Sequence, residues 1–183
     1  SELPIRLTNG SDGVPLDLMI QLCNDSNTDG WFCINVNATS SYVDAFLARI
    51  KSNLKPTLKA YIELSNEVWN TMFPQYTLIG SAGNGDTHTQ HMTAFALKSA
   101  DLAVKTKSVL GAQGISVLGA QSPATWWMNE LLTIIKSAGK IPPEVVATAP
   151  YFGSGLADNA TSITSGALLI AANRSIADVI TGR

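Results

Sequence analysis

The sequence predicts an α/β fold with a parallel sheet built from (β/α) units. Four short apolar runs are each followed by a helical pattern, which is typical of strands joined by crossover helices. The 183 residues fit a single domain over 1–183, and a hydrophobic content of 45% is enough to bury a core. Right-handed crossovers allow an open doubly wound sheet or part of a closed barrel. Because a full (β/α)8 barrel needs about 200–250 residues or more, this chain would form about half of one.

Each element follows from its own apolar pattern. The buried strands are expected over residues 16–23, 58–64, 114–121 and 144–151. Apolar residues at helical spacing predict helices from Ser40 or Ser41 to Leu54, from Met92 to Gly111, from Trp127 to Gly139, and over 163–180. The stretch 68–86 between the second strand and its helix is expected to be a long loop, and such loops usually serve function.

The composition favours a secreted protein. Charged residues make up 14% of the chain, below the roughly 25% of an average soluble protein, and Ser, Thr and Asn replace them. A net charge of -2 without any Lys/Arg cluster argues against a nucleic-acid partner. No apolar run of about 18 residues is present, so no membrane span is expected. Without a visible signal peptide, and with Ser1 first, the sequence is expected to be a mature product or a fragment of something longer.

Cysteines and sequons also fit an extracellular protein. Cys23 and Cys33 could close a short disulfide loop, the alternative being two free thiols. Five Asn-x-Ser/Thr sequons are candidates for N-glycosylation, at Asn9, Asn24, Asn37, Asn159 and Asn173.

Residues 61–70, Tyr-Ile-Glu-Leu-Ser-Asn-Glu-Val-Trp-Asn, have the side chains that sugar chemistry uses. Glu67 could donate a proton, Asn66 could hydrogen-bond a sugar hydroxyl, and Trp69 could stack on a pyranose ring. Strand alternation would place Glu63 and Glu67 on the same face. The alternative is that Glu67 and Asn70 cap the next helix while Trp69 fills the core.

The expected carboxyl ends of the other strands are also polar or aromatic. These ends carry the site in either arrangement of parallel strands. They hold Cys-Asn-Asp at 23–25, Gln-Ser at 121–122 and Pro-Tyr-Phe at 150–152. Their convergence favours a functional Glu67 over a cap.

Residues 62–70 resemble the acid/base strand of clan A glycoside hydrolases, which are retaining enzymes with a (β/α)8 TIM barrel. The resemblance is closest to cellulase-like and "cellulose-binding" hypothetical proteins with a Glu-x-Ser-Asn-Glu-x-Trp-Asn signature. Weaker similarity lies in 23–25 with Trp31-Phe32 and Ala38-Thr39, in 119–121 and in 149–152. The resemblance covers about 16–155 and corresponds to barrel strands three to six, which implies a partial TIM barrel.

The resemblance implies a site that hydrolyses a polysaccharide or oligosaccharide. Glu67 would be the general acid/base, Asn66 would bind the 2-hydroxyl, and Tyr151 would face the catalytic carboxylates. The other candidates for substrate binding are Trp69, Trp31, Asp25, Gln121 and Trp126. Trp126 is included because it diverges by about 100° from Trp127 on a helix, so one ring packs in the core while the other can line the cleft.

The resemblance does not extend to the nucleophile of the family. Retaining hydrolysis needs a second carboxylate about 5–5.5 Å from the acid/base, and the family supplies it as a Glu after strand seven. Only Asp158 and Asp178 follow Tyr151 here. We therefore expect a fragment of a hydrolase, a half-barrel that does not catalyse, or a homo-oligomer in which a second copy completes the barrel. The alternative function is a secreted glycan-binding or structural glycoprotein that self-assembles.

Two patterns suggest a metal less strongly, and no other cofactor is expected. Asp25, Asn27 and Asp29 precede Gly30 with the spacing of a calcium loop, but the twelfth position is Val36; the alternative is a hydrogen-bonded turn. His88 and His91, after Asp86, lack a third ligand at a recognised spacing, which favours a solvated helix start.

Overall fold

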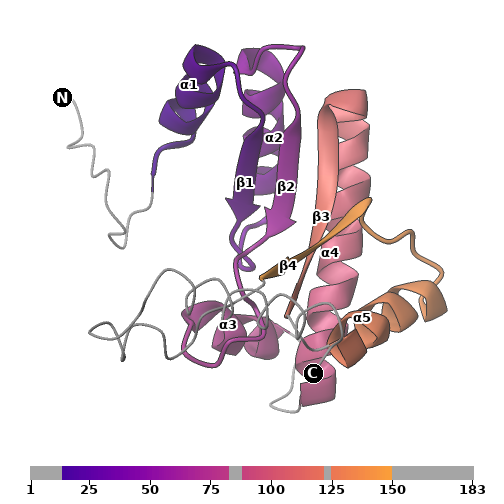
Figure 1. Ribbon diagram of the computed structural model, residues 1–183. Coiled ribbons are helices and arrows are strands. Elements are labelled where there is room, and N and C mark those ends of the chain that lie inside the picture. Colours follow the sequence, from indigo (N-terminus) through magenta and orange to yellow (C-terminus); the bar gives the residue numbers. More distant parts are fainter. Residues whose placement is uncertain (1–13, 83–87, 122–124, 150–183) are drawn as a thin grey trace, which may run out of the picture.

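The computed structural model describes residues 14–82, 88–121 and 125–149 (Figure 1). They form an α/β fold around a four-stranded, all-parallel sheet, which confirms the predicted fold class. The strands are β1 (Gly30–Ile34), β2 (Ala60–Leu64), β3 (Gly114–Gln121) and β4 (Val145–Ala149).

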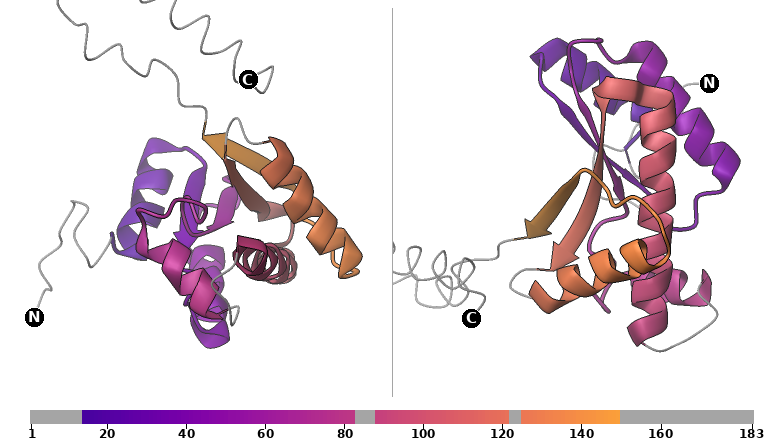
Figure 2. Two further views of the ribbon diagram at one scale, coloured as in Figure 1. Left: turned by 90° about the horizontal axis from the view of Figure 1, so that it is seen from below. Right: turned by 90° about the vertical axis from the view of Figure 1, so that its right-hand side faces the viewer.

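The strands follow one another across the sheet in the order β1-β2-β3-β4. A doubly wound sheet would reverse this order at a switch point, whereas consecutive units of a barrel keep it. The helices that link the strands are α2 (Ser40–Asn53), α4 (His88–Leu110) and α5 (Thr125–Ser137). Right-handed crossovers between adjacent strands bring such helices to one face of the sheet, and Figure 2 shows α2 and α4 against the same face.

The two faces of the sheet differ in their side chains. On the face under the helices, Phe32 pairs with Ile62 and Ile34 with Leu64, and all four are buried. On the opposite face, Trp31 pairs with Tyr61 and Cys33 with Glu63. We call this opposite face, which continues along β3 through Val117 and Gly119, the helix-free face. Because one face is apolar and covered, the strand register is strongly specified.

The predicted helices α2, α4 and α5 are confirmed, and local capping explains their ends. The N-cap of α2 is Thr39, whose hydroxyl accepts the backbone N–H of Tyr42 at 3.2 Å, so the helix begins at Ser40. Gly111 and Gly139, at φ of 60° and 67°, follow α4 and α5 in the left-handed conformation that favours glycine at a helix end.

The predicted strand over 16–23 is wrong, because these residues belong to helix α1 (Leu16–Ser26). Its apolar residues Leu16, Met19, Ile20 and Cys23 recur at helical spacing and pack against the core. Asn27, at φ 53°, ends the helix. The first strand is instead β1, where no strand was predicted.

The expected loop over 68–86 contains the helix α3 (Pro74–Ala82), so that prediction is only partly correct. His91 of α4 packs directly over Gly80, where no Cβ stands in its way, and its ring lies 4.3 Å from that of Tyr76. This contact holds α3 beside the start of α4, at the carboxyl ends of the strands (Figure 1). The helix predicted over 163–180 lies outside the described residues.

Among the described residues, no helix combines the length and apolar character that crossing a membrane requires.

Candidate functional site

The chain after β2 is held in an unusual conformation. Ser65 and Glu67 have φ values of 54° and 44°, in the left-handed region that residues other than glycine rarely adopt. Such a conformation costs about 1–3 kcal/mol at each residue and persists where the surroundings enforce it, often at active sites. The strain falls on the strand end that the sequence predicts to be functional.

Hydrogen bonds on several sides hold this turn in place. The N–H of Ser65 donates to the carbonyl of Ile34 at 2.7 Å, and the Ser65 hydroxyl accepts the N–H of Val36 at 3.2 Å. The side-chain amide of Gln75, on α3, donates to the carbonyl of Asn66 at 2.5 Å. The turn is thus fastened to β1 and to α3.

Glu67 lies in a polar pocket of about 300 Å³ at the carboxyl ends of β2 and β3. The side-chain amide of Asn70 donates to Glu67 Oε2 at 2.9 Å and orients the carboxyl group. Trp69, Thr71 and Gln121 complete the lining. A carboxyl, two amides and an indole around one pocket can exchange a proton, hydrogen-bond hydroxyls and stack on an apolar ring face.

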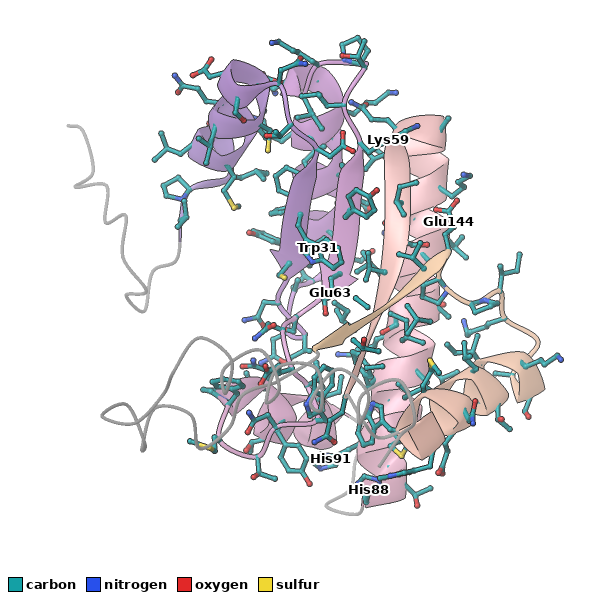
Figure 3. The ribbon with its side chains drawn as sticks, viewed as in Figure 1. Trp31, Lys59, Glu63, His88, His91 and Glu144 are labelled. Atoms are coloured by element: carbon teal, nitrogen blue, oxygen red, sulfur yellow. The ribbon has the colours of Figure 1, made fainter. Side chains whose placement is uncertain are left out.

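A second carboxyl group, that of Glu63, lies on the helix-free face (Figure 3). Glu63 is only 7% exposed. The indole N–H of Trp31 donates to its Oε2 at 2.8 Å, and the Cys33 thiol donates to the same oxygen at 3.8 Å. Burial raises the pKa of Glu63, while the hydrogen bonds from Trp31 and Cys33 act in the opposite direction. Burial, the charge of Glu63 and its hydrogen bond together raise the pKa of Cys33 to about 12.

The structure brings three of the predicted site residues together: Glu67, Trp69 and Gln121 line one pocket. Asn66 is exposed and does not line it. Trp31 lies on the helix-free face, hydrogen-bonded to Glu63 instead. Tyr151 lies outside the described residues.

Trp126 and Trp127 diverge as predicted, with exposed fractions of 54% and 3%. The ring of Trp126 lies 5.5 Å from that of His88 and 5.9 Å from that of Trp127. It does not line the pocket of Glu67.

Asp25 does not belong to the site, so the prediction that 23–25 ends a strand beside Glu67 is wrong. Asp25 lies in α1, which precedes β1 and contacts the segment that leads into β2. The neighbouring Asn24 hydrogen-bonds Asn53 and Lys55. Asp25 is therefore at the amino ends of the strands, and Glu67 is at their carboxyl ends.

Cys23 and Cys33 are both free thiols, so the predicted disulfide is wrong. Cys23, on α1, lies against Gly30 on the helix-covered face of β1. Cys33 is on the other face of the same strand because side chains alternate along it. The strand itself separates the two sulfur atoms.

Two of the five candidate glycosylation sites are described. The amide nitrogen of Asn24 donates to the carbonyl of Asn53 at 2.8 Å, and its oxygen accepts the N–H of Lys55 at 2.9 Å, so this side chain is engaged in the fold. Asn37 is exposed in the turn after β1. Asn9, Asn159 and Asn173 lie outside the described residues.

The stretches considered as metal sites have structural partners. Asp29 accepts the backbone N–H of Lys59 at 2.7 Å, and Asn27 ends α1. The rings of His88 and His91 face different aromatic partners, the tryptophans of α5 and Tyr76. Asp86 lies outside the described residues. In the described part of the chain, no three His, Cys, Asp or Glu side chains gather as a metal site would require.

A larger pocket, of about 520 Å³, lies elsewhere, between α4 and the start of β4. Its lining is mainly apolar and includes Val104 and Ile141, with the ion pair between Lys107 and Glu144 at its edge. It borders the beginning of β3 and β4 and is separate from the pocket of Glu67.

The sequence did not reveal the hydrogen bonds of Glu63 with Trp31 and Cys33, or those that Asn70 and Gln75 donate. The pairing of Cys33 with Glu63 depends on the register between β1 and β2, and the sequence did not predict β1. Asn70 carried a signal, because an Asn three residues after Glu67 suits a tight turn.

No family model, curated protein or solved structure matches the chain.

Proposed function

We propose that this chain carries the acid/base half of a retaining β-glycoside hydrolase site, acting on a polysaccharide or oligosaccharide outside the cell. The observation that carries the proposal is the strained placement of Glu67 in a pocket with Trp69, Asn70 and Gln121. The resemblance of residues 62–70 to the acid/base strand of clan A enzymes supports the same assignment.

The pocket supplies what the acid/base step needs. In retaining hydrolysis, a protonated carboxyl group donates its proton to the departing glycosidic oxygen, and the resulting carboxylate then activates water. The bond from Asn70 is to Oε2 and, within the described part of the chain, leaves Oε1 of Glu67 available for this proton transfer. Trp69 offers a ring face for stacking, and the amide of Gln121 can bind a hydroxyl.

A nucleophile must come from outside the described residues. Among them, Glu67 is the one carboxylate that lines this pocket. Glu63 lies on the same strand but accepts hydrogen bonds from Trp31 and Cys33, and burial raises its pKa. Glu63 is therefore engaged with β1 and does not line the pocket of Glu67.

A second candidate function is glycan binding or a structural role without catalysis, in a protein that self-associates. Parallel sheets are normally covered on both faces, yet on the helix-free face Trp31 is 49% exposed and Val145 37%. Among the described strands, β1 and β4 each have one unpaired edge. A second copy could pair with both edges and close an eight-stranded barrel. This candidate predicts a dimer by light scattering, and sugar binding without turnover.

Glu67→Gln tests the first candidate, because glutamine keeps the shape and hydrogen-bonding capacity but cannot donate an acidic proton. Hydrolysis of β-linked oligosaccharides by the full-length protein should fall by about 10²–10⁴-fold. Glu130→Gln, an exposed change on α5, is the matched control and should leave turnover unchanged. Unchanged turnover by Glu67→Gln would refute the assignment.

A further inference from the structure

Glu63 joins two neighbouring strands through their side chains. Its carboxyl group accepts the indole N–H of Trp31 at 2.8 Å and the thiol of Cys33 at 3.8 Å, both at Oε2. Figure 3 shows Trp31 and Glu63 on adjacent strands of the helix-free face.

The other carboxyl oxygen of Glu63 occupies space that a glycine provides. A Cβ added to Gly119 on β3 would lie 2.5 Å from Glu63 Oε1 and 3.5 Å from Cζ3 of Trp69. Glu63 and the Trp69 ring therefore lie against the same point above Gly119. Since Trp69 also lines the pocket of Glu67, the carboxyl group of Glu63 lies beside the ring that borders this pocket.

Trp31 is held by a second contact in addition to its hydrogen bond. Its ring is stacked on that of Tyr61, with ring centroids 5.4 Å apart and planes 8° from parallel. The stack fixes the plane of the indole, and the bond to Glu63 fixes its rotation within that plane. Even with these contacts, Trp31 is 49% exposed. A rigid, partly exposed indole is well suited to contact a sugar ring.

We propose that Glu63 is a positioning residue that orients the indoles of Trp31 and Trp69, so that both contact a β-linked oligosaccharide whose cleaved bond lies at Glu67. The sugar contact rests on the proposed function, whereas the positioning of the two indoles does not. Glu63 itself does not touch the reacting atoms.

Ionisation of Glu63 supplies a signature of this role. The ionised carboxylate accepts the indole N–H of Trp31 more strongly than the neutral acid does. Burial raises the pKa of Glu63, so the change of charge falls above the ordinary value of 4.5. Among the described residues, Cys33 on β1 is the titratable group that contacts Glu63, and Tyr61, two residues earlier on β2, is stacked on Trp31. Glu67 lines one pocket with the ring of Trp69, and the facing Gly119 on β3 carries no charge. Cys33, with a pKa of about 12, does not titrate below pH 8.

The first test follows the indole N–H resonances of 15N-labelled protein between pH 4 and pH 8, with Trp31→Phe and Trp69→Phe providing assignments. We expect the Trp31 resonance to shift with a midpoint above 4.5, and the Trp69 resonance to include a component with the same midpoint. This shift should be absent in Glu63→Gln and retained in Glu130→Gln. Resonances that do not titrate, or that titrate equally in Glu63→Gln, would overturn the positioning role.

The second test measures binding of cellohexaose, xylohexaose and mannohexaose to the full chain by calorimetry. We expect one of them to bind, about tenfold more weakly to Glu63→Leu, and with most of that loss rescued in Glu63→Gln, which keeps an acceptor for Trp31. Equal affinities for wild type and Glu63→Leu would overturn the role of Glu63 in sugar contact. Failure of the wild type to bind any of the three would instead contradict the proposed function, and the indole titration reports on Glu63 in either case.

Discussion

The indole N–H of Trp31 on β1 donates a 2.8 Å hydrogen bond to Oε2 of Glu63 on β2. The bond crosses between adjacent strands on the face without helices, and it ends on a carboxyl group that is only 7% exposed. A group this well covered makes the stability of the fold depend on pH.

The contribution of Glu63 to the free energy of unfolding should decrease as pH rises. Its pKa is raised in the folded state, so the folded chain holds this proton at pH values where the unfolded chain has released it. The associated stability is complete below the ordinary pKa of 4.5, which applies to the unfolded chain, and is lost as pH rises through the folded value. Urea unfolding of wild type and Glu63→Gln from pH 4 to pH 7 should show that the variant gains relative stability with pH. A difference between them that is constant with pH would contradict this.

Glycine at position 67 should relieve backbone strain. Because φ of Glu67 is 44°, we expect Glu67→Gly to be about 1 kcal/mol more stable than Glu67→Ala. Position 130, within α5, is the control, since there glycine should be about 1 kcal/mol less stable than alanine. Chemical unfolding of the four variants measures both differences. The same order at both positions would show that the turn after β2 is not strained.

The two thiols should be free but unequal in reactivity. The unfolded protein should react as two thiols without prior reduction, since neither cysteine is paired. In the folded protein at pH 8, alkylation of Cys33 should be at least about tenfold slower than in urea, because the thiolate is the reactive form and a pKa of about 12 makes it scarce. Mass spectrometry after timed alkylation measures this. Thiols that become detectable only after reduction would contradict this and would show that Cys23 and Cys33 form a disulfide.

Ser116 should matter for the start of β4. Its N–H donates to Glu144 Oε2 at 3.2 Å, and its hydroxyl accepts the N–H of Glu144 at 3.0 Å. Ser116→Ala removes the second bond and should lower the free energy of unfolding by about 1 kcal/mol. Ser108→Ala, at an exposed position on α4, should not lower it because alanine is the better helix former. Equal free energies of unfolding for Ser116→Ala and Ser108→Ala would contradict this role of Ser116.

Much of the fold could be predicted from local patterns. The bounds of β3 match the prediction, and α2 and α4 have clear apolar stripes with identifiable ends. The region before Asp29 could not be predicted as easily, because the apolar residues of α1 are nearly continuous and fit a strand and a helix alike. That single error displaced Asp25 and Cys23 to the wrong end of the sheet.

The candidate site was only partly accessible to sequence reasoning. Glu67, Trp69 and Gln121 could be placed together because strand ends of a parallel sheet converge. The link from Trp31 through Glu63 to Gly119 could not be predicted. It depends on the register across three strands and on the space that the missing side chain of Gly119 leaves. Backbone strain at Ser65 and Glu67 has no sequence signal, because neither residue is a glycine.

The most direct test of Glu67 as acid/base uses the leaving group of the substrate. Dinitrophenolate departs without needing a proton, whereas a sugar oxygen needs one. In the full-length protein, Glu67→Ala should therefore release dinitrophenolate from a 2,4-dinitrophenyl β-glycoside in the first turnover at nearly the wild-type rate. Its hydrolysis of the matching oligosaccharide should fall by about 10²–10⁴-fold, with Glu130→Ala unaffected on both substrates. An equal loss on both substrates, or no loss on either, would contradict the assignment.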